Sequence, residues 1–433
     1  MITRARVQNY KTLRDVEVDL APLTVIFGPN SAGKSNLYDA LSLLSRIATR
    51  PNLEDAFKGH RGSSLEAFSF GPKGVEDIMQ QESAEFAVEA DIRLSSAVIE
   101  SVEAQIRRAR EGLPGVSPAA LKRRSITETR LRYGVRVEIR TVSGHLRVID
   151  EYLIPLRSDG QPSNARKPFL EKVGARNIRL RMEKQGHPSN EEVGQGRSIV
   201  SKGLYPPHYP HMAALREELS RWRFYYLEPT AMREEVPLRE VDSLDQRGTQ
   251  IAAFFNTLLA SNPPQFGAVS KALHQVIPNL DGIGVERTAE GFVRLLVSES
   301  GMRASARVVS EGTLRVLALL AITNPIEPVS VVGYEEPENG VHPRRLELVA
   351  NLLRRVAERG PTQLLINTHS PILPEYFQDV QQGVLLRCYR SNGSTTFEPF
   401  DPGPLFMRDE VEAALDEDLT PFRERVVRGD FGG

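Results

Sequence analysis

The sequence predicts an α/β protein with a mixed sheet, an antiparallel β subdomain and a helical lobe. Three observations lead to this fold class. Apolar strands alternate with helical patterns at the start and over the last third of the chain, which is typical of a parallel sheet. Period-two segments within 84–156 indicate an antiparallel meander, and helical patterns dominate from about 212 to 277. The sequence shows no sustained heptads, so we expect no long coiled coil.

The first elements are short and clearly separated. RARVQNY and VEVDL alternate like strands, PLTVIFG is an apolar run, and a helix is expected from about Ala32 through LYDALSLLSRI. Further strands are expected at 84–94, 133–141 and 145–156, with a helix near 95–111. Residues 158–210 are rich in Pro, Gly, Ser and Asn, which favours long loops with one short strand at NIRLRME.

The second half begins with helices and ends in alternation. Helices are expected at HMAALREELSRWR, TQIAAFFNTLLAS and FGAVSKALHQVI. Strands at 283–298, 329–334 and 363–367 alternate with helices from Gly312 and over 343–358. We therefore divide the chain into an N-terminal lobe (1–190), a mainly helical segment (191–308) and a C-terminal half (309–433).

Bulk composition excludes several classes of protein. The 55 basic and 56 acidic residues give a net charge of -1, so only a local patch could attract nucleic acid. The single cysteine, Cys388, excludes an internal disulfide and a cysteine-rich metal site, which fits a reducing compartment. The longest apolar run, LRVLALLAI, is interrupted by Arg315 and is too short for a bilayer. The start MITRARVQNYK lacks a signal-peptide core. We expect a cytoplasmic protein without a membrane segment.

A phosphate-binding loop follows the apolar run LTVIF. Residues 28–36, GPNSAGKSN, fit the pattern G-x-x-x-x-G-K-[ST] between a strand and a helix. In this pattern glycines let backbone N–H groups surround phosphate oxygens at a helix N-terminus, Lys34 reaches the β and γ phosphates, and the Ser35 hydroxyl ligates Mg²⁺. The alternative is an ordinary glycine-rich turn. The predicted nucleotide-binding residues are Asn30, Ser31, Ala32, Gly33, Lys34, Ser35 and Asn36.

Two neighbouring carboxylates end a second apolar strand. VSVVGYEE places Glu335 where an acid would hold Mg²⁺, through water or directly, and Glu336 where a base would accept a proton from the attacking water. The alternative is a solvated pair at a helix start, where acids are favoured by the helix dipole. The phosphate-binding loop upstream favours the metal-binding and catalytic interpretation.

Two further segments are candidates for phosphate contacts. The strand QLLIN ends in THSP and brings His369 to a strand terminus as a γ-phosphate sensor, although a lone histidine is more often a packing or capping residue. In VSEGTLRVLALL, Ser310 and Gly312 open an amphipathic helix, which is either an anion site or an ordinary N-cap.

Taken in order, GPNSAGKSN, VSEGTLR, EEPENGVHP and NTHSP resemble the SMC/RecF-like branch of the ABC ATPases. Within that branch the chain is similar to the compact bacterial "AAA family ATPase" proteins found in phage-defence systems. The resemblance implies an ABC-type P-loop ATPase head and a head-to-tail homodimer that encloses ATP and Mg²⁺.

The same resemblance assigns residues. Ser310 and Gly312 match the signature motif, which would touch the γ-phosphate bound by the partner subunit. Glu335 matches the Walker B acid, Glu336 the catalytic glutamate and His369 the switch histidine. Asn339 and Gly340 lie in the D-loop, and either Gln80 or Gln81 stands for the Q-loop glutamine. The chain departs from the transporter pattern at Glu311, where glycine is usual, and at Glu335, where aspartate is usual.

Two charged stretches invite other interpretations. From Arg107 to Arg140 there are ten basic residues and three acids, which is either a DNA or RNA contact or a solvated face. Residues 401–418 form an acidic tail that includes Asp416, Glu417 and Asp418. An acidic helix is a simpler interpretation of this tail than a TOPRIM-type nuclease site, because too few residues follow His369 to form that domain.

The expected function is ATP binding and hydrolysis that control a separately encoded effector, such as a TOPRIM or HNH nuclease, in antiphage defence. The alternative is a RecF/SMC-like DNA-repair ATPase that binds DNA directly. A transporter subunit is disfavoured by the long insertion between the P-loop and the signature, and a GTPase by the lack of an N-K-x-D motif.

Overall fold

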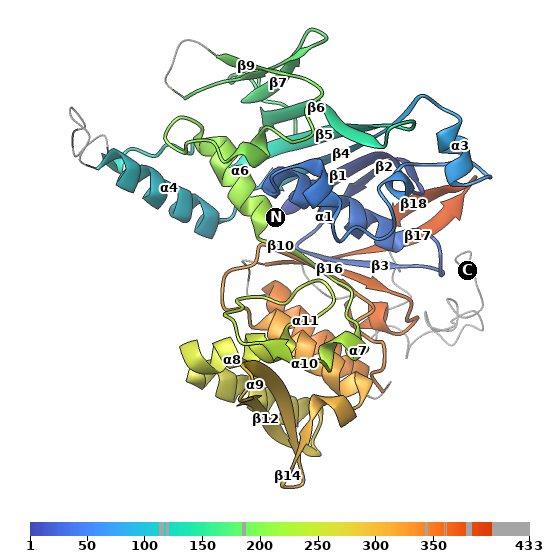
Figure 1. The fold of residues 1–433 in the computed structure, drawn as a ribbon, viewed down its shortest axis with the longest axis vertical. Coiled ribbons are helices and arrows are strands. Elements are labelled where there is room, and N and C mark those ends of the chain that lie inside the picture. The colour runs from blue at the N-terminus through green and yellow to red at the C-terminus, as the bar shows by residue number, and fades with distance from the viewer. Residues whose placement is uncertain are drawn as a thin grey trace, which may run out of the picture. The chain divides into compact units, whose positions relative to one another are not determined.

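A computed structural model describes residues 1–111, 117, 121–183, 188–342, 345–358, 360, 362–377 and 383–400 (Figure 1). The chain forms two compact units. The first contains residues 1–21, 31–222 and 388–398, and the second contains the described parts of 22–30, 223–387 and 399–433. Each unit is treated by itself below. The division into three sequence segments stays a prediction.

An eight-stranded antiparallel sheet forms the centre of the first unit, in the order β2-β1-β4-β5-β6-β7-β8-β9. Its strands are β1 (Ile2–Tyr10), β2 (Leu13–Asp19), β4 (Ser83–Arg93), β5 (Arg130–Arg140), β6 (His145–Pro155), β7 (Leu170–Val173), β8 (Asn177–Leu180) and β9 (Ser189–Glu192). Alternation positions the side chains: in β5, Leu131, Tyr133, Val135 and Val137 are buried. The predicted antiparallel subdomain is confirmed.

Ion pairs cross the strands on the other face of this sheet. Arg4 of β1 contacts Glu17 of β2 at 2.9 Å and Asp91 of β4 at 3.3 Å, and it also pairs with Glu89. On β5, Arg132 Nε lies 2.6 Å from Asp91 Oδ1. Acidic and basic strands therefore alternate across β2, β1, β4 and β5, and each arginine is neutralised by its neighbours.

Replacing Arg132 by alanine is expected to lower the free energy of unfolding by about 3 kcal/mol, because Asp91, only 3% exposed, would lose its main cationic partner. Replacing Arg136 is the control: its contact with Glu85, 3.6 Å long, is between exposed groups and should contribute less than about 1 kcal/mol. Urea unfolding of both variants measures the difference. Equal, small losses would show that the pair with Asp91 is not a stabilising one.

Helices cover the apolar side of the first unit's sheet. They are α1 (Lys34–Thr49), α2 (Leu53–Phe57), η1 (Leu65–Ala67), α3 (Val75–Met79), α4 (Ser96–Arg110), η2 (Val200–Lys202) and α6 (Pro210–Ser220). Helix α1 buries Leu37, Leu41, Leu44 and Ala48, which recur at helical spacing. It packs against α6, where Ser45 Oγ donates a hydrogen bond to the Leu219 carbonyl at 2.7 Å.

A six-stranded mixed sheet belongs to the second unit, in the order β10-β15-β16-β3-β17-β18. Its strands are β10 (Trp222–Tyr225), β15 (Val331–Glu335), β16 (Gln363–Thr368), β3 (Leu23–Phe27), β17 (Gly383–Ser391) and β18 (Ser394–Pro399), of which Trp222 and residues 388–398 are grouped with the first unit. Strands β15, β16, β3 and β17 are parallel. Glu335 is in register with Asn367, and Thr368 with Phe27, so three strands end at one edge.

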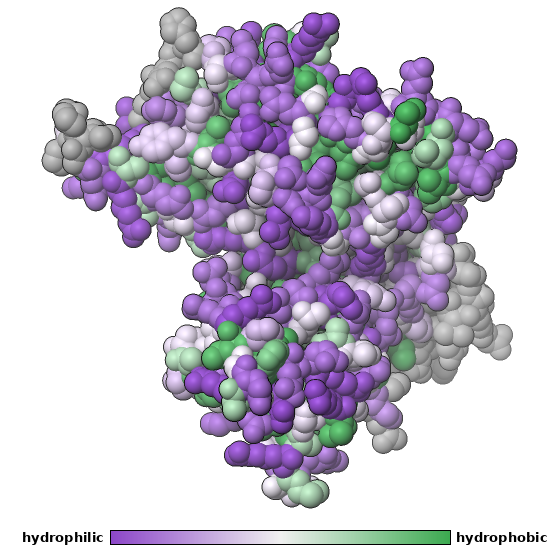
Figure 2. Space-filling view, viewed as in Figure 1, coloured by the Kyte–Doolittle hydropathy of each residue, from purple (hydrophilic) through white to green (hydrophobic). Residues whose placement is uncertain are grey.

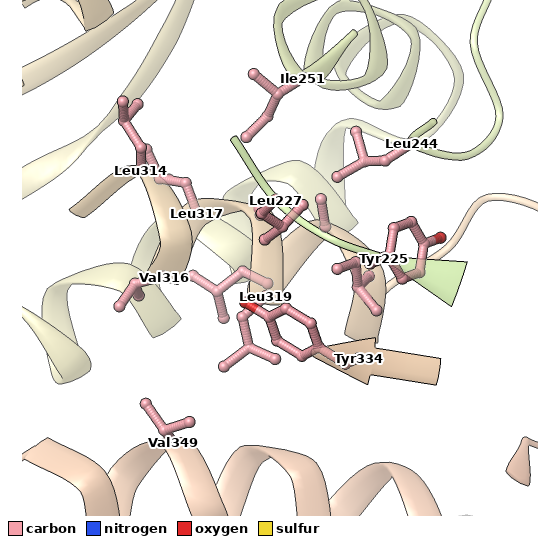
Figure 3. Packing of buried hydrophobic residues seen from close by; sticks show 14 of the residues in the cluster. Tyr225, Leu227, Leu244, Ile251, Leu314, Val316, Leu317, Leu319, Tyr334 and Val349 are labelled. Carbon is pink, nitrogen blue, oxygen red and sulfur yellow. The ribbon is translucent and has the colours of Figure 1, made fainter. Parts of the chain in front are cut away.

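The rest of the second unit comprises helices and a small antiparallel sheet. The helices are α7 (Pro229–Met232), α8 (Ile251–Ser261), α9 (Pro263–Val276), η3 (Ala306–Val308), α10 (Glu311–Thr323), α11 (Leu346–Glu358) and η5 (Leu373–Phe377). The small sheet contains β11 (Val236–Pro237), β12 (Leu280–Arg287), β13 (Phe292–Glu299) and β14 (Met302–Ser305). Figure 3 shows Leu317 of α10, Tyr334 of β15 and Val349 of α11 meeting in one apolar core. This core supports the strand that carries Glu335.

The predicted fold class is confirmed: strands and helices form a mixed α/β head, and within the described residues no helix exceeds the 16 residues of α1. No helix in this part of the chain is both long and apolar enough to cross a membrane. Hydrophilic side chains cover most of the surface of each unit seen in Figure 2. Two local predictions were wrong. The helix expected through Arg223 ends at Ser220, and Trp222–Tyr225 form β10. The stretch 158–210, expected to contain one short strand, contains β7 and β9 besides β8.

Candidate functional site

The phosphate-binding loop has the backbone of an anion cradle. It begins after Phe27, the last residue of β3, and ends where α1 starts at Lys34. Gly33 is the N-cap of α1 with φ of 104°, and no side chain caps the helix there. Ser31 also has a positive φ, 63°. No side chain caps the N-terminus of this 16-residue helix, which is the position at which helices bind phosphate.

Two threonines from other segments of the chain hold this loop. Thr395 of β18 is buried, and its Oγ1 donates to the Ala32 carbonyl at 2.7 Å. Thr12, between β1 and β2, lies 2.6 Å from Thr395 Oγ1 and accepts a hydrogen bond from Asn36 Nδ2 at 2.7 Å. A Cβ on Gly33 would lie 2.0 Å from Thr395 Oγ1. Only glycine fits here, and the hydroxyl pair keeps the Ala32 carbonyl turned to one side of the loop.

The predicted nucleotide-binding residues differ in exposure. Asn30 and Ser31 are exposed, Ser35 is half-buried, and Lys34 is 3% exposed. Burial raises the pKa of the nearby Cys388 thiol to about 12, and the positive charge of Lys34 partly offsets that increase. The Lys34 side chain is therefore largely enclosed at the start of α1.

A charged cluster beside α1 was missed by sequence analysis. Asp39, one turn beyond Ser35, is 5% exposed and contacts Lys11 Nζ at 2.7 Å and Arg61 Nε at 3.3 Å. Tyr10 places its hydroxyl 2.8 Å from His60 Nε2, and burial lowers the pKa of His60 to about 4. The two cations come from turns remote in sequence, so no spacing signal connects them to the loop.

At the edge where β15 and β16 end, the two glutamates have different environments. Glu335 is the last residue of β15, is 3% exposed and lies beside Asn367 of β16. Glu336 leaves the strand with φ of 50° and donates its backbone N–H to the Asn367 carbonyl at 2.7 Å. One carboxylate is thus enclosed at the strand end, and the next is turned out of the sheet.

His369 and Glu336, both predicted as catalytic, lie in contact. The ring Nε2 of His369 is 2.8 Å from Glu336 Oε1, and Asn339 Nδ2 donates to Glu336 Oε2. The hydrogen bond from His369 is the largest influence that lowers the pKa of Glu336, with smaller contributions from Asn339 and Arg315. Glu336 is therefore held as a carboxylate, the form that accepts a proton.

The start of α10 approaches the turn after Glu336 very closely. Ser310 caps the helix, with its Oγ accepting the Thr313 N–H at 3.2 Å. A Cβ on Gly312 would lie only 2.0 Å from the Gly340 carbonyl oxygen. Ser310 is therefore the N-cap of α10 in the structure. Position 312 requires glycine, because its backbone contacts the backbone of Gly340 in the predicted D-loop.

Comparisons with known proteins match both halves of the chain. Residues 1–99 match a family model described as "AAA ATPase domain", and residues 209–373 match one described as "AAA domain, putative AbiEii toxin, Type IV TA system". The fold is similar to a crystal structure of an SMC head bound to the C-terminal winged-helix domain of ScpA. That match has a TM-score of 0.53 and 12% identity, and covers 93% of this chain and 98% of that one.

The chain is an AAA-type ATPase with the fold of an SMC head.

A second SMC head, bound to the C-terminal domain of ScpA from Pyrococcus furiosus, gives a TM-score of 0.51 and 11% identity, and covers 92% of the ATPase and 96% of that chain. Among curated proteins, the OLD nuclease of Thermus scotoductus is 43% identical over 44 residues, which is 10% of the ATPase. The match spans only 8% of the length of that nuclease.

The donor set of the ATPase suits Mg²⁺ and a triphosphate. Within the described residues, no group of three or more His, Cys, Asp or Glu side chains is arranged to hold a metal. Mg²⁺ usually takes one or two protein oxygens and completes its shell with water and phosphate. The Ser35 hydroxyl and the Glu335 carboxylate are donors of that kind, and the uncapped start of α1 suits the phosphates.

The remaining predictions for the ATPase concern the Q-loop glutamine, the basic stretch and the acidic tail. Gln80 and Gln81 follow α3 on the surface of the first unit, and Gln81 Nε2 donates to the Asp77 carbonyl at 3.1 Å. In the range Arg107–Arg140, Arg132 and Arg136 are in ion pairs on β5, which reduces the positive charge of that stretch. The tail 401–418, with Asp416, Glu417 and Asp418, lies outside the described residues.

Proposed function

We propose that the ATPase binds Mg–ATP through its phosphate-binding loop, hydrolyses it with Glu336 and closes as a homodimer around the nucleotide. The observation that carries this proposal is the contact between Glu336 and His369 at the sheet edge where β3 leads into the loop. In ATP hydrolysis, the Glu336 carboxylate paired with His369 would serve as the base and the enclosed Glu335 as a metal ligand. The start of α1, which no side chain caps, would bind the phosphates.

Each residue has a distinct role in the proposal. Lys34 and the backbone N–H groups of residues 32–35 bind and orient the phosphates. Glu336 accepts a proton from the attacking water, and His369 keeps its carboxylate oriented and ionised. The predicted Mg²⁺ ligands are Ser35 and Glu335, and bound Mg²⁺ would neutralise charge on the phosphate oxygens.

Release of inorganic phosphate from Mg–ATP by the purified chain tests this proposal. A Lys34→Ala variant is the control, because it removes the phosphate contact and leaves Glu336 in place. Calorimetry on the same samples measures nucleotide binding separately from turnover. No binding heat and no phosphate release with the unaltered chain would remove the proposed function.

In the proposed dimer, Ser310 and Gly312 contact the γ-phosphate bound by the partner subunit, as the resemblance implies. Replacing Ser310 by arginine is expected to leave ATP binding by the monomer unchanged and to prevent ATP-driven dimerisation, because the larger side chain blocks that contact. Ser310→Ala is the matched control, since both substitutions remove the N-cap hydroxyl and cost about 1 kcal/mol of helix stability. Light scattering in Mg–ATP reports the mass, and a normal dimer of the arginine variant would contradict the assignment.

The proposed biological role is a sensor or regulatory subunit that controls a separate effector nuclease in antiphage defence. The family resemblance supports this role, as does the match to a model described in terms of a toxin–antitoxin system. Direct DNA binding, as in DNA repair, is the second candidate. Arg132 and Arg136, which lie on β5 within the basic stretch, already form ion pairs with acidic side chains, so this part of the stretch is a less favourable contact for DNA. A mobility-shift assay with Mg–ATP and duplex DNA separates the two candidates, since only the repair function requires binding by the chain alone.

A further inference from the structure

The turn that follows Glu336 is internally hydrogen-bonded. The Asn339 N–H donates to the Glu336 carbonyl at 3.1 Å, and the Val341 N–H donates to the Glu338 carbonyl at 2.9 Å. Gly340 completes the turn with φ of 68°. This compact turn fixes the backbone at Glu338 and thereby limits the direction in which its side chain can point.

The Glu338 carboxylate binds the loop that carries His369. Its Oε1 accepts hydrogen bonds from Thr368 Oγ1 at 2.6 Å, from the His369 N–H at 3.0 Å and from the Ser370 N–H at 3.1 Å. Its other oxygen, Oε2, is buried and has no hydrogen-bond partner among the described residues. All the hydrogen bonds of the carboxylate in the described structure therefore go to one loop of three residues, which begins at Thr368, the last residue of β16.

Hydrogen bonds within the loop shape it locally. Thr368 Oγ1 accepts the Ser370 N–H at 2.9 Å, and Ser370 Oγ accepts the N–H groups of Ile372 and Leu373, both at 3.2 Å. Glu338 ties this loop to the turn carrying Glu336, in addition to the contact of His369 with Glu336. A carboxylate suits this task because hydrogen bonds to a charged acceptor are about twice as strong as neutral ones.

We propose that Glu338 is a positioning residue, which anchors residues 368–370 so that the His369 ring meets the Glu336 carboxylate. The proposal rests on the proposed role of Glu336 in ATP hydrolysis. Glu338 contacts neither of the two side chains through its carboxylate; it acts through the backbone of His369. Loss of the anchor leaves ATP binding by the phosphate loop intact and impairs the hydrolytic step.

Kinetics of four variants test the proposal. Glu338→Ala should lower kcat about 10–100-fold, the range found for residues that orient a functional side chain, with the Kd for Mg–ATP changed less than about threefold. Glu338→Gln keeps an acceptor at the Oε1 position and should lose less than about tenfold. His369→Ala and the double variant Glu338→Ala/His369→Ala should have equal kcat, because Glu338 acts through His369. Glu347→Gln, an exposed glutamate at the start of α11, is the control and should match the unaltered chain.

Hydrogen exchange gives a readout that does not depend on turnover. In the nucleotide-free chain, Glu338→Ala should increase amide exchange at His369 and Ser370 by about tenfold or more, and Glu338→Gln by less. Unchanged exchange and kcat in Glu338→Ala would overturn the proposal, and so would additive losses in the double variant. If the unaltered chain fails to hydrolyse ATP while the exchange result holds, the proposed function fails and the anchoring of this loop by Glu338 stands.

Discussion

Replacing Glu336 by glutamine is expected to lower ATP turnover by about 10²–10⁴-fold, which is the contribution of a positioned general base. Glutamine has nearly the same shape and keeps an oxygen for the hydrogen bond from His369, 2.8 Å away in the unaltered chain. It has no basic carboxylate, so the attacking water has no proton acceptor. Nucleotide binding depends on the phosphate loop and should be unchanged.

Single-turnover phosphate release and calorimetry with Mg–ATP measure the two effects separately. The control is Glu347→Gln, which removes the same charge from an exposed position of the same unit. In light scattering, Glu336→Gln should also accumulate as an ATP-bound dimer, because closure is no longer followed by hydrolysis. Turnover within about twofold of the unaltered chain would exclude Glu336 as the base, whatever the effect on dimerisation.

Replacing Gly33 by alanine is expected to weaken Mg–ATP binding by at least about tenfold. The residue has φ of 104°, and a backbone in such a region costs about 1–3 kcal/mol for other residues. The new methyl group would also lie 2.0 Å from Thr395 Oγ1 and 2.6 Å from Thr12 Oγ1. The hydroxyl pair would have to separate, and the Ala32 carbonyl would lose the bond that holds it away from the phosphate side.

The matched control is Gly74→Ala, because Gly74 also has a positive φ, 70°, but nothing lies within 4 Å of its added Cβ. Gly74→Ala has the same kind of backbone strain, but its new methyl group meets no neighbouring atom and the residue lies outside the phosphate loop. Calorimetry compares the Kd of both variants, and thermal unfolding shows whether either loses the fold. Tight binding by Gly33→Ala would contradict the anion-cradle geometry of the loop.

The parts of the candidate site that sequence analysis could identify are those set by local pattern. Strand, glycine loop and helix are adjacent in the chain, so the conformation around Gly33 follows from neighbouring residues. Glu335, Glu336 and His369 were recognisable because each follows an apolar strand, and parallel strands bring their carboxyl ends to one edge. The roles of these residues in binding and hydrolysis stay predictions.

The parts that could not be predicted depend on contacts between remote segments. Thr395 reaches the loop from β18, a strand whose sequence STTFEP carries no strong signal and was not predicted. Lys11 meets Asp39 through a turn with positive φ, 48°. Glu338 lies in the motif EEPENGVHP, but only the fold shows that its carboxylate turns back to a loop some thirty residues later.

The contact between Gly312 and Gly340 gives the second unit a rigid linkage. A carbonyl oxygen pressed against a bare Cα has no side chain to absorb a displacement, so the first turn of α10 and the turn after Glu336 move as one piece. Through Glu338, the histidine loop belongs to the same piece. In the proposed dimer, each copy would thus transmit the state of its own nucleotide to Ser310 and Gly312, which contact the nucleotide bound by the partner subunit. No large rearrangement of the chain would be needed.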